Sequence, residues 1–154
     1  MSILSRFMRT GALGVVTPGA DYRDVVDAWG EPEAFAKQHP DPVYCLYGDL
    51  ELAFTKKGRL YYLQIEPGGS SVSLPAGPGE RLQEPLPEVS ELVADLVEEG
   101  FHITEVPHPF EPEVIWSRID RSGVEFRQDD SDGQLSVHLE VRDIYRHDHG
   151  ITTP

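Results

Sequence analysis

The sequence predicts an α+β protein in which two related α-β-β units form an antiparallel sheet with helices packed on one face. The first observation is a hairpin pattern over residues 48–66, where apolar residues alternate on both sides of a Lys-Lys-Gly turn. A weaker copy of this pattern spans residues 122–141. An amphipathic helix pattern precedes each hairpin. Because neither unit alone covers its strands, we expect the two units to join edge to edge around one core.

Two short helices are expected before the first hairpin. Near the N-terminus, four apolar residues at helical spacing predict a helix that docks on the body of the protein, namely Ile3, Leu4, Phe7 and Met8. For the next helix, Asp21 is suited to be the N-cap, and Gly30 followed by Pro32 ends it. Its apolar stripe consists of Tyr22, Val25, Val26 and Trp29.

A short strand at residues 43–48 is expected to lead into the first hairpin. It contains the lone Cys45, which we interpret as a buried structural thiol. In the hairpin, successive residues should point to opposite faces of the sheet. For the second strand this alternation predicts two opposite faces, with Leu60, Tyr62 and Gln64 on one and Tyr61, Leu63 and Ile65 on the other.

The middle of the chain has the composition of a linker. Twelve of the twenty-one residues from 67 to 87 are Gly, Pro or Ser, so regular structure is not expected there. The alternative is an ordered connection across a sheet edge, which three apolar residues would allow: Val72, Leu74 and Leu82.

The second half repeats the order of elements. A helix is expected at 89–97, followed by a short strand or an extended entry at 101–106. Strands are expected at 114–119, 124–127 and 135–141, with an exposed acidic turn at 128–133. After Arg142 no pattern predicts burial, so the tail is expected to be unpacked. The chain is therefore divided into 1–66, 67–87, 88–143 and 144–154, which we expect to form one compact domain.

The charge of the chain limits the classes of partner that it can bind. The formal net charge is −14, and residues 78–154 alone carry six basic and eighteen acidic side chains. Such a surface repels nucleic acid and anionic membranes and favours a basic protein. No transmembrane run or signal peptide is recognisable, and one cysteine fits a reducing cytoplasm. Ten Arg against three Lys favour a bacterial source with a GC-rich genome.

The sequence offers no catalytic constellation and no metal or cofactor motif. It contains no phosphate-binding glycine loop, no dinucleotide fingerprint and no nucleophile elbow. Zinc motifs such as C-x-x-C and H-E-x-x-H are also absent. We therefore predict no catalytic residue, no metal ligand and no cofactor, and we lean away from an enzyme.

Candidate binding residues come from the hairpins. Glu51 and Glu125 occupy matching positions, and both should lie on the face opposite the core, where Tyr62 adds contact area. The second half of the chain contains further acidic residues that are expected to contact a basic partner, with Trp116 as an aromatic anchor. These residues are Glu98, Glu99, Asp129, Asp130, Asp132 and Glu140.

Two motifs in the first half resemble those of small bacterial immunity-protein-like domains. The first is a helix that ends in Gly30-x-Pro32, and the second is Tyr-Gly-x-Leu-Glu-Leu-x-Phe from Tyr47 to Phe54. The tandem helix-plus-hairpin plan is similar in outline to the beta-lactamase inhibitor proteins. The resemblance implies a protein that acts by occluding another protein, and it carries over no catalytic residue.

The leading hypothesis is thus a non-catalytic binding module of the immunity type that neutralises a basic toxin such as a nuclease. One alternative is a small enzyme or ligand-binding domain that uses the sheet face near Glu51, Glu125 and Tyr62, with a histidine as base. Another is a subunit or adaptor that docks through residues 3–8. The sequence does not predict an oligomeric state.

Overall fold

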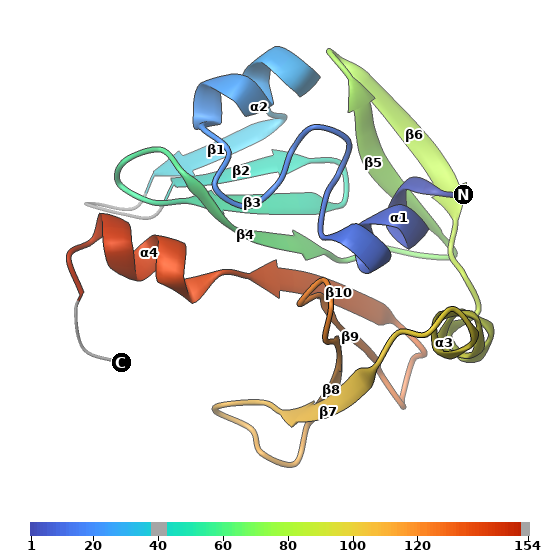
Figure 1. The fold of residues 1–154 in the computed structure, drawn as a ribbon. Coiled ribbons are helices and arrows are strands. Elements are labelled where there is room, and N and C mark those ends of the chain that lie inside the picture. The colour runs from blue at the N-terminus through green and yellow to red at the C-terminus, as the bar shows by residue number, and fades with distance from the viewer. Residues whose placement is uncertain (38–42, 152–154) are drawn as a thin grey trace.

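The structure is a computed structural model that describes residues 1–37 and 43–151. An eight-stranded antiparallel sheet runs through both halves of the chain, and a separate two-stranded hairpin and four helices accompany it (Figure 1). The predicted α+β class with an antiparallel sheet is confirmed. The helices are α1 (Ile3–Thr10), α2 (Tyr22–Trp29), α3 (Val89–Glu98) and α4 (Arg142–Asp148). The strands of the large sheet are β1 (Ala34–Lys37), β2 (Val43–Tyr47), β3 (Leu50–Phe54), β4 (Leu60–Ile65), β7 (Ile103–Pro107), β8 (Ile115–Ile119), β9 (Glu125–Gln128) and β10 (Leu135–Glu140).

The order of strands in the large sheet is β1-β2-β3-β4-β10-β9-β8-β7. Each half of the chain contributes four consecutive antiparallel strands, and the halves meet in the middle, where Leu63 of β4 lies opposite Leu139 of β10. Each half therefore adds more strands to the sheet than the predicted α-β-β plan contains. That the two halves are related units, and that the helices pack on one face, remain predictions.

A β-bulge in the first hairpin changes the predicted faces of β4. Ala53 pairs with Tyr62, but Phe54 pairs with Leu60, so Tyr61 is an extra residue between the two pairs. Leu60 is therefore buried on the same side as Leu63, whereas the alternation had placed them on opposite faces. The prediction for Leu60 was wrong because strict alternation assumes a regular ladder.

The core lies between one face of the sheet and the elements in front of it in Figure 1, chiefly α1, α2 and the small hairpin. The predicted N-terminal helix is confirmed, since Leu4, Phe7 and Met8 are buried in the core. The predicted N-cap of α2 is also confirmed, because the side chain of Asp21 accepts a hydrogen bond from the backbone N–H of Arg23. Cys45 is buried as expected, and this burial raises the pKa of its thiol to about 11.

The segment interpreted as an irregular linker instead forms the two-stranded hairpin of β5 (Ser71–Gly77) and β6 (Glu80–Pro85). Val72 and Leu74 are buried in the core, which provides the apolar contacts that a mobile linker would lack. Asp49 attaches this hairpin to the sheet, because its backbone N–H donates to the Ser73 carbonyl (2.9 Å) and its carboxylate accepts from the Ser73 N–H (2.7 Å). The Gly/Pro/Ser composition therefore belongs to an ordered connection, which was the alternative interpretation.

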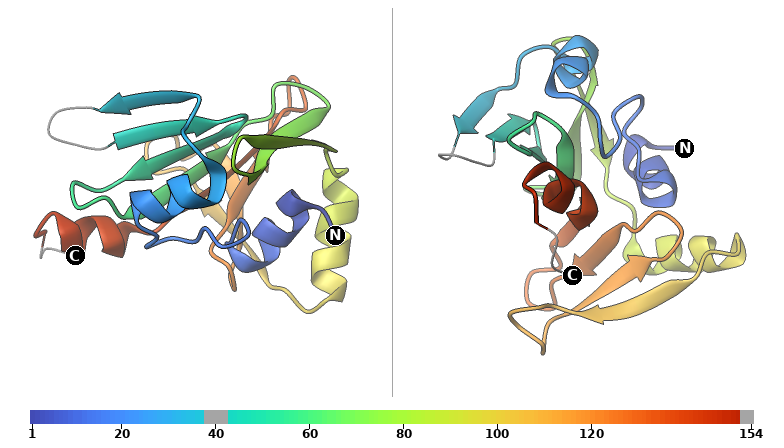
Figure 2. Two further views of the ribbon diagram at one scale, coloured as in Figure 1. Left: turned by 90° about the horizontal axis from the view of Figure 1, so that it is seen from above. Right: turned by 60° about the vertical axis from the view of Figure 1, so that its left-hand side comes forward.

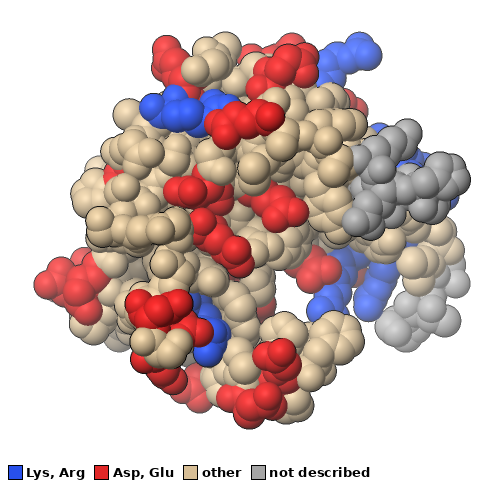
Figure 3. All heavy atoms as spheres, turned by 180° about the vertical axis from the view of Figure 1, so that it is seen from behind, with Lys and Arg blue, Asp and Glu red and all other residues tan. Residues whose placement is uncertain are grey.

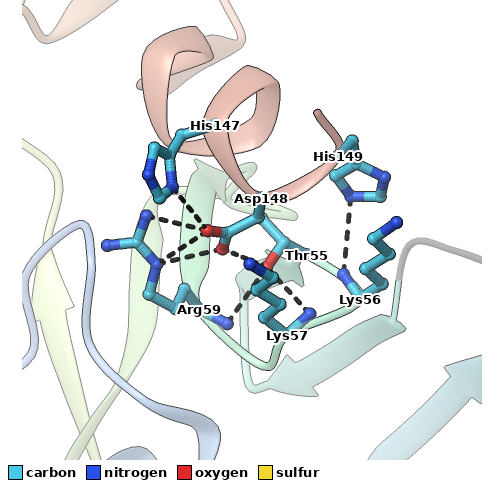
Figure 4. Close-up of polar contacts among 7 residues, drawn as sticks. All are labelled: Thr55, Lys56, Lys57, Arg59, His147, Asp148 and His149. Atoms are coloured by element: carbon cyan, nitrogen blue, oxygen red, sulfur yellow. Dashed lines mark hydrogen bonds and ion pairs between the residues drawn. The ribbon is translucent and has the colours of Figure 1, made fainter. Parts of the chain in front are cut away.

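The expectation of an unpacked tail was also wrong, because residues 142–148 form α4. Buried Asp148 holds this helix against the turn between β3 and β4 (Figure 4). Its carboxylate accepts hydrogen bonds from Nε of Arg59 (2.9 Å) and Oγ1 of Thr55 (2.6 Å). The hydrogen bond from Arg59, and after it that from Thr55, holds the pKa of Asp148 well below its usual range.

The large sheet is strongly curved. Its outer strands β7 and β8 turn away from the plane of β1–β4 (Figure 2). The pairing of β8 with β9 is the shortest in the large sheet and consists of Ser117 with Phe126 and Arg118 with Glu125. The curvature brings the β7–β8 hairpin over the face of the sheet that lies opposite the core.

Candidate functional site

The face of the sheet opposite the core carries polar and aromatic side chains in two rows; we call it the open face. The registers place one row across five strands, from β3 to β8, consisting of Glu51, Gln64, His138, Glu125 and Arg118. The neighbouring row consists of Tyr44, Tyr62 and Glu140, with the small, buried Ala53 between the two tyrosines. These positions alternate along their strands with buried core residues such as Leu52, Leu63, Leu139 and Phe126.

A cavity of about 400 Å³ lies between the open face and the β7–β8 hairpin; we call it the hairpin cavity. This volume is within the range of small-ligand sites, roughly 300–1,000 Å³. Its aromatic and acidic walls are formed by Tyr62, Glu66, Phe110, Trp116, Glu125 and Glu140. A second, shallower hollow next to it shares Tyr62, Gln64 and Glu140 and adds Glu51 and Tyr44.

His138 and Glu125 form the centre of the hairpin cavity. Nε2 of His138 lies 2.7 Å from Oε1 of Glu125, a contact that favours the tautomer with its proton on Nε2 and the carboxylate as acceptor. The imidazole is flanked by two other rings, with the Trp116 centroid at 4.4 Å and the Tyr62 centroid at 6.2 Å. This packing fixes the orientation of the imidazole.

A second set of hydrogen bonds runs along β4. The Tyr62 hydroxyl donates to Oε1 of Gln64 (2.7 Å), and the Gln64 amide in turn donates to the carboxylate of Glu66. Burial raises the pKa of the Tyr62 phenol, and the nearby carboxylates of Glu140, Glu51 and Glu66 raise it further. Tyr62 therefore stays protonated and stands among three negative charges.

The cations on the open face do not balance these carboxylates. Arg142 lies 3.6 Å from Glu140, and Arg118 lies 3.4 Å from Asp120. In the described residues neither Glu51 nor Glu66 has a Lys, Arg or His nitrogen within 4.0 Å. Seen from behind, acidic side chains stand in the middle of the molecule above a hollow in its surface (Figure 3). The open face is therefore suited to a cationic group.

The structure brings together five of the ten residues that the sequence proposed for binding a partner: Glu51, Tyr62, Trp116, Glu125 and Glu140. The others lie elsewhere, with Asp129, Asp130 and Asp132 in the turn between β9 and β10, and Glu98 and Glu99 at the C-terminal end of α3. Glu99 is engaged by Arg9 at 2.6 Å. The proposed residues thus do not form one surface.

Sequence reasoning missed the residues that complete the hairpin cavity. His138, Glu66, Phe110 and Arg142 line this cavity, and none of them was among the residues proposed for binding a partner. Phe110 is 90% exposed at the rim of the cavity, so it fits the part of an aromatic anchor better than Trp116. Trp116 is half-buried, and its indole Nε1 is buried with no acceptor among the described residues. The only signal for this grouping was the alternation in β4 and β10.

Clusters elsewhere in the described part of the chain do not add a second site. No group of three or more His, Cys, Asp or Glu residues in 1–37 and 43–151 has the geometry to hold a metal ion. The buried carboxylate of Asp148 is occupied by Arg59 and Thr55, which makes it an anchor for α4. No helix within these residues is long and apolar enough to cross a bilayer.

Comparison with known proteins finds no family model that matches this chain, and no curated protein or solved structure that matches it significantly. The functional argument therefore depends on the open face alone.

Proposed function

We propose that this protein is a non-catalytic binding module of the immunity type, which neutralises a basic toxin such as a nuclease by covering its cationic surface. The observation that carries the proposal is the open face, where four carboxylates and two aromatic rings line two adjoining hollows: Glu51, Glu66, Glu125, Glu140, Tyr62 and Trp116. A nuclease must be cationic where it meets phosphate, so an acidic face complements it.

The charge distribution supports rapid association. Residues 78–154 carry most of the net charge of −14, and this half supplies Glu125 and Glu140 to the open face. Long-range attraction between an acidic face and a basic partner raises the association rate and orients the encounter. Exposed Phe110 at the rim adds the apolar contact that charge alone does not provide.

The test begins by using the protein as bait in an extract of its source cell, with the Glu51→Gln, Glu66→Gln, Glu140→Gln triple variant as the control bait. The proposal expects a basic protein to be recovered with the unaltered bait and lost with the variant. The recovered protein is then purified, and its activity is measured with and without this protein. If the activity is unchanged in the complex, neutralisation is contradicted.

A second candidate function is binding or conversion of a small molecule in the hairpin cavity. The observation that favours it is the paired His138 and Glu125 inside a concave site, an arrangement in which a carboxylate orients a general base. Turnover of a small molecule that is lost in His138→Gln, together with no recovered protein partner, would establish this alternative over the binding module.

Docking through the N-terminal segment is not favoured. Leu4, Phe7 and Met8 are part of the protein's own core, and the Glu84 carboxylate of β6 accepts a hydrogen bond from the Ile3 N–H (2.9 Å). Deleting this segment would therefore remove core packing as well as any docking surface.

A further inference from the structure

Three carboxylates line the hairpin cavity, those of Glu66, Glu125 and Glu140, beside donors on Arg142, Gln64 and the Trp116 indole. The Tyr62 hydroxyl and one N–H of the Gln64 amide are used along this edge of the cavity, and only Oε1 of the Glu66 carboxylate has a partner in the described residues. The Glu125 carboxylate binds His138 through one oxygen, and its other oxygen is similarly available. A group that binds these carboxylates must therefore bring several N–H donors.

The walls of the hairpin cavity also select for shape. Three flat rings line this cavity. The ring centroids of Trp116 and Tyr62 lie 4.4 and 6.2 Å from that of the His138 imidazole between them. A cation held over such rings is stabilised by the negative face of the aromatic system. A guanidinium group combines this stacking with a planar fork of donors that matches a carboxylate, whereas an ammonium group is a compact, strongly hydrated charge.

We propose that the hairpin cavity receives the guanidinium group of an arginine side chain presented by the protein partner, stacked on the rings and bound by Glu66 and Glu140. The inference rests on the proposed function and names the group that enters the site. Arg142 is the internal competitor, because it lies 3.6 Å from Glu140 and lines the same cavity. Its removal should therefore strengthen binding of a cation.

The probe is the peptide acetyl-Gly-Arg-Gly-amide, and its matched control contains citrulline, which has nearly the same shape but no charge. The signal is the indole N–H resonance of Trp116 in the full chain, distinguished from that of the only other tryptophan by a Trp29→Phe variant. We expect saturable shifts with the arginine peptide, at least tenfold weaker binding of the citrulline peptide, and at least threefold weaker binding of a lysine peptide.

Three variants complete the test. Glu66→Gln should weaken binding of the arginine peptide several-fold, Arg142→Gln should strengthen it, and Glu51→Gln, outside this cavity, should change it less than Glu66→Gln. Equal binding of the arginine and citrulline peptides, no saturable shift, or weaker binding in Arg142→Gln would overturn the proposal.

These outcomes separate the cavity from the proposed function. If a neutralised partner is recovered but the Trp116 resonance does not respond to the arginine peptide, the arginine site fails and the binding module stands. If the peptide binds as expected but no protein partner is neutralised, the arginine site stands and the immunity function fails.

Discussion

Nε2 of His138 lies 2.7 Å from Oε1 of Glu125, and the two residues face each other across β10 and β9 in the register of the sheet. This contact fixes the imidazole that supports Trp116 in the hairpin cavity. His138 is therefore a structural element of the open face as well as a polar group within it.

Replacing His138 by Ala should loosen Trp116 while leaving the fold intact, because His138 is on the open face and not in the core. We expect the Trp116 fluorescence to shift to longer wavelength as the indole gains contact with water. The control is His102→Ala, whose side chain is exposed and distant in the chain from this contact. Equal emission spectra for both variants would show that His138 does not support Trp116.

Replacing Asp148 by Asn should destabilise the protein, since the charged hydrogen bonds from Arg59 to the buried carboxylate are lost. We expect the melting temperature to fall by roughly 5 °C for a domain of this size. The control on the same helix is Asp143→Asn. The Asp143 side chain is 95% exposed, and its ion pair with Arg146 is long, at 4.0 Å. That change should shift the melting temperature by about 1 °C or less.

The stabilisation by Asp148 should depend on pH in a defined direction. Its pKa is lowered in the folded protein, chiefly by the hydrogen bond from Arg59, so below about pH 4 the unfolded chain binds a proton that the folded one does not. The stabilisation is present above that unfolded pKa and is lost as the pH falls towards the folded one. The difference in melting temperature between the unaltered protein and Asp148→Asn should therefore be constant from about pH 8 to 5 and shrink below about pH 4. A difference that persists unchanged at pH 2.5 would contradict this assignment.

The attachment of the β5–β6 hairpin can be tested at two glycines. Gly48 and Gly58 both have a positive φ, 61° and 79°, but a Cβ at Gly48 would meet the Ser73 carbonyl oxygen at 2.7 Å, whereas a Cβ at Gly58 would meet nothing within 4 Å. We expect Gly58→Ala to cost about 1 kcal/mol from the backbone conformation alone. Gly48→Ala should cost about 2–4 kcal/mol, because the hairpin must also move. Urea unfolding measures both, and equal losses would mean that the contact with Ser73 is not required.

Local periodicity predicted most of the elements that form this fold. The amphipathic stripes of α1, α2 and α3 and the alternation in β3, β9 and β10 were visible because each pattern lies within one element. The β5–β6 hairpin was missed because Gly, Pro and Ser outnumber the two residues that it adds to the hydrophobic core, Val72 and Leu74. Helix α4 was missed because a charged residue, Asp148, anchors it to Arg59, 89 positions earlier in the chain.

The candidate site was predictable only in part, because it depends on contacts between strands that are far apart in the chain. Period-two alternation placed Glu51, Glu125 and Glu140 away from the core. It does not reveal that β7 and β8 curve over that face, which is why Phe110 and Glu66 were missed. The acidic turn at residues 129–132 attracted attention by composition, although it lies outside the lining of both hollows of the open face.

The central claim is that the open face, and not acidity in general, binds the basic partner. The most direct measurement compares association rates with the purified partner for two variants that each remove three negative charges. One is Glu51→Gln, Glu66→Gln, Glu140→Gln on the open face, and the other is Glu98→Gln, Asp130→Asn, Asp132→Asn elsewhere. We predict that the first slows association about tenfold at low salt and weakens its salt dependence, while the second slows it less than about threefold. Equal slowing by both variants, or greater slowing by the second, would contradict the account.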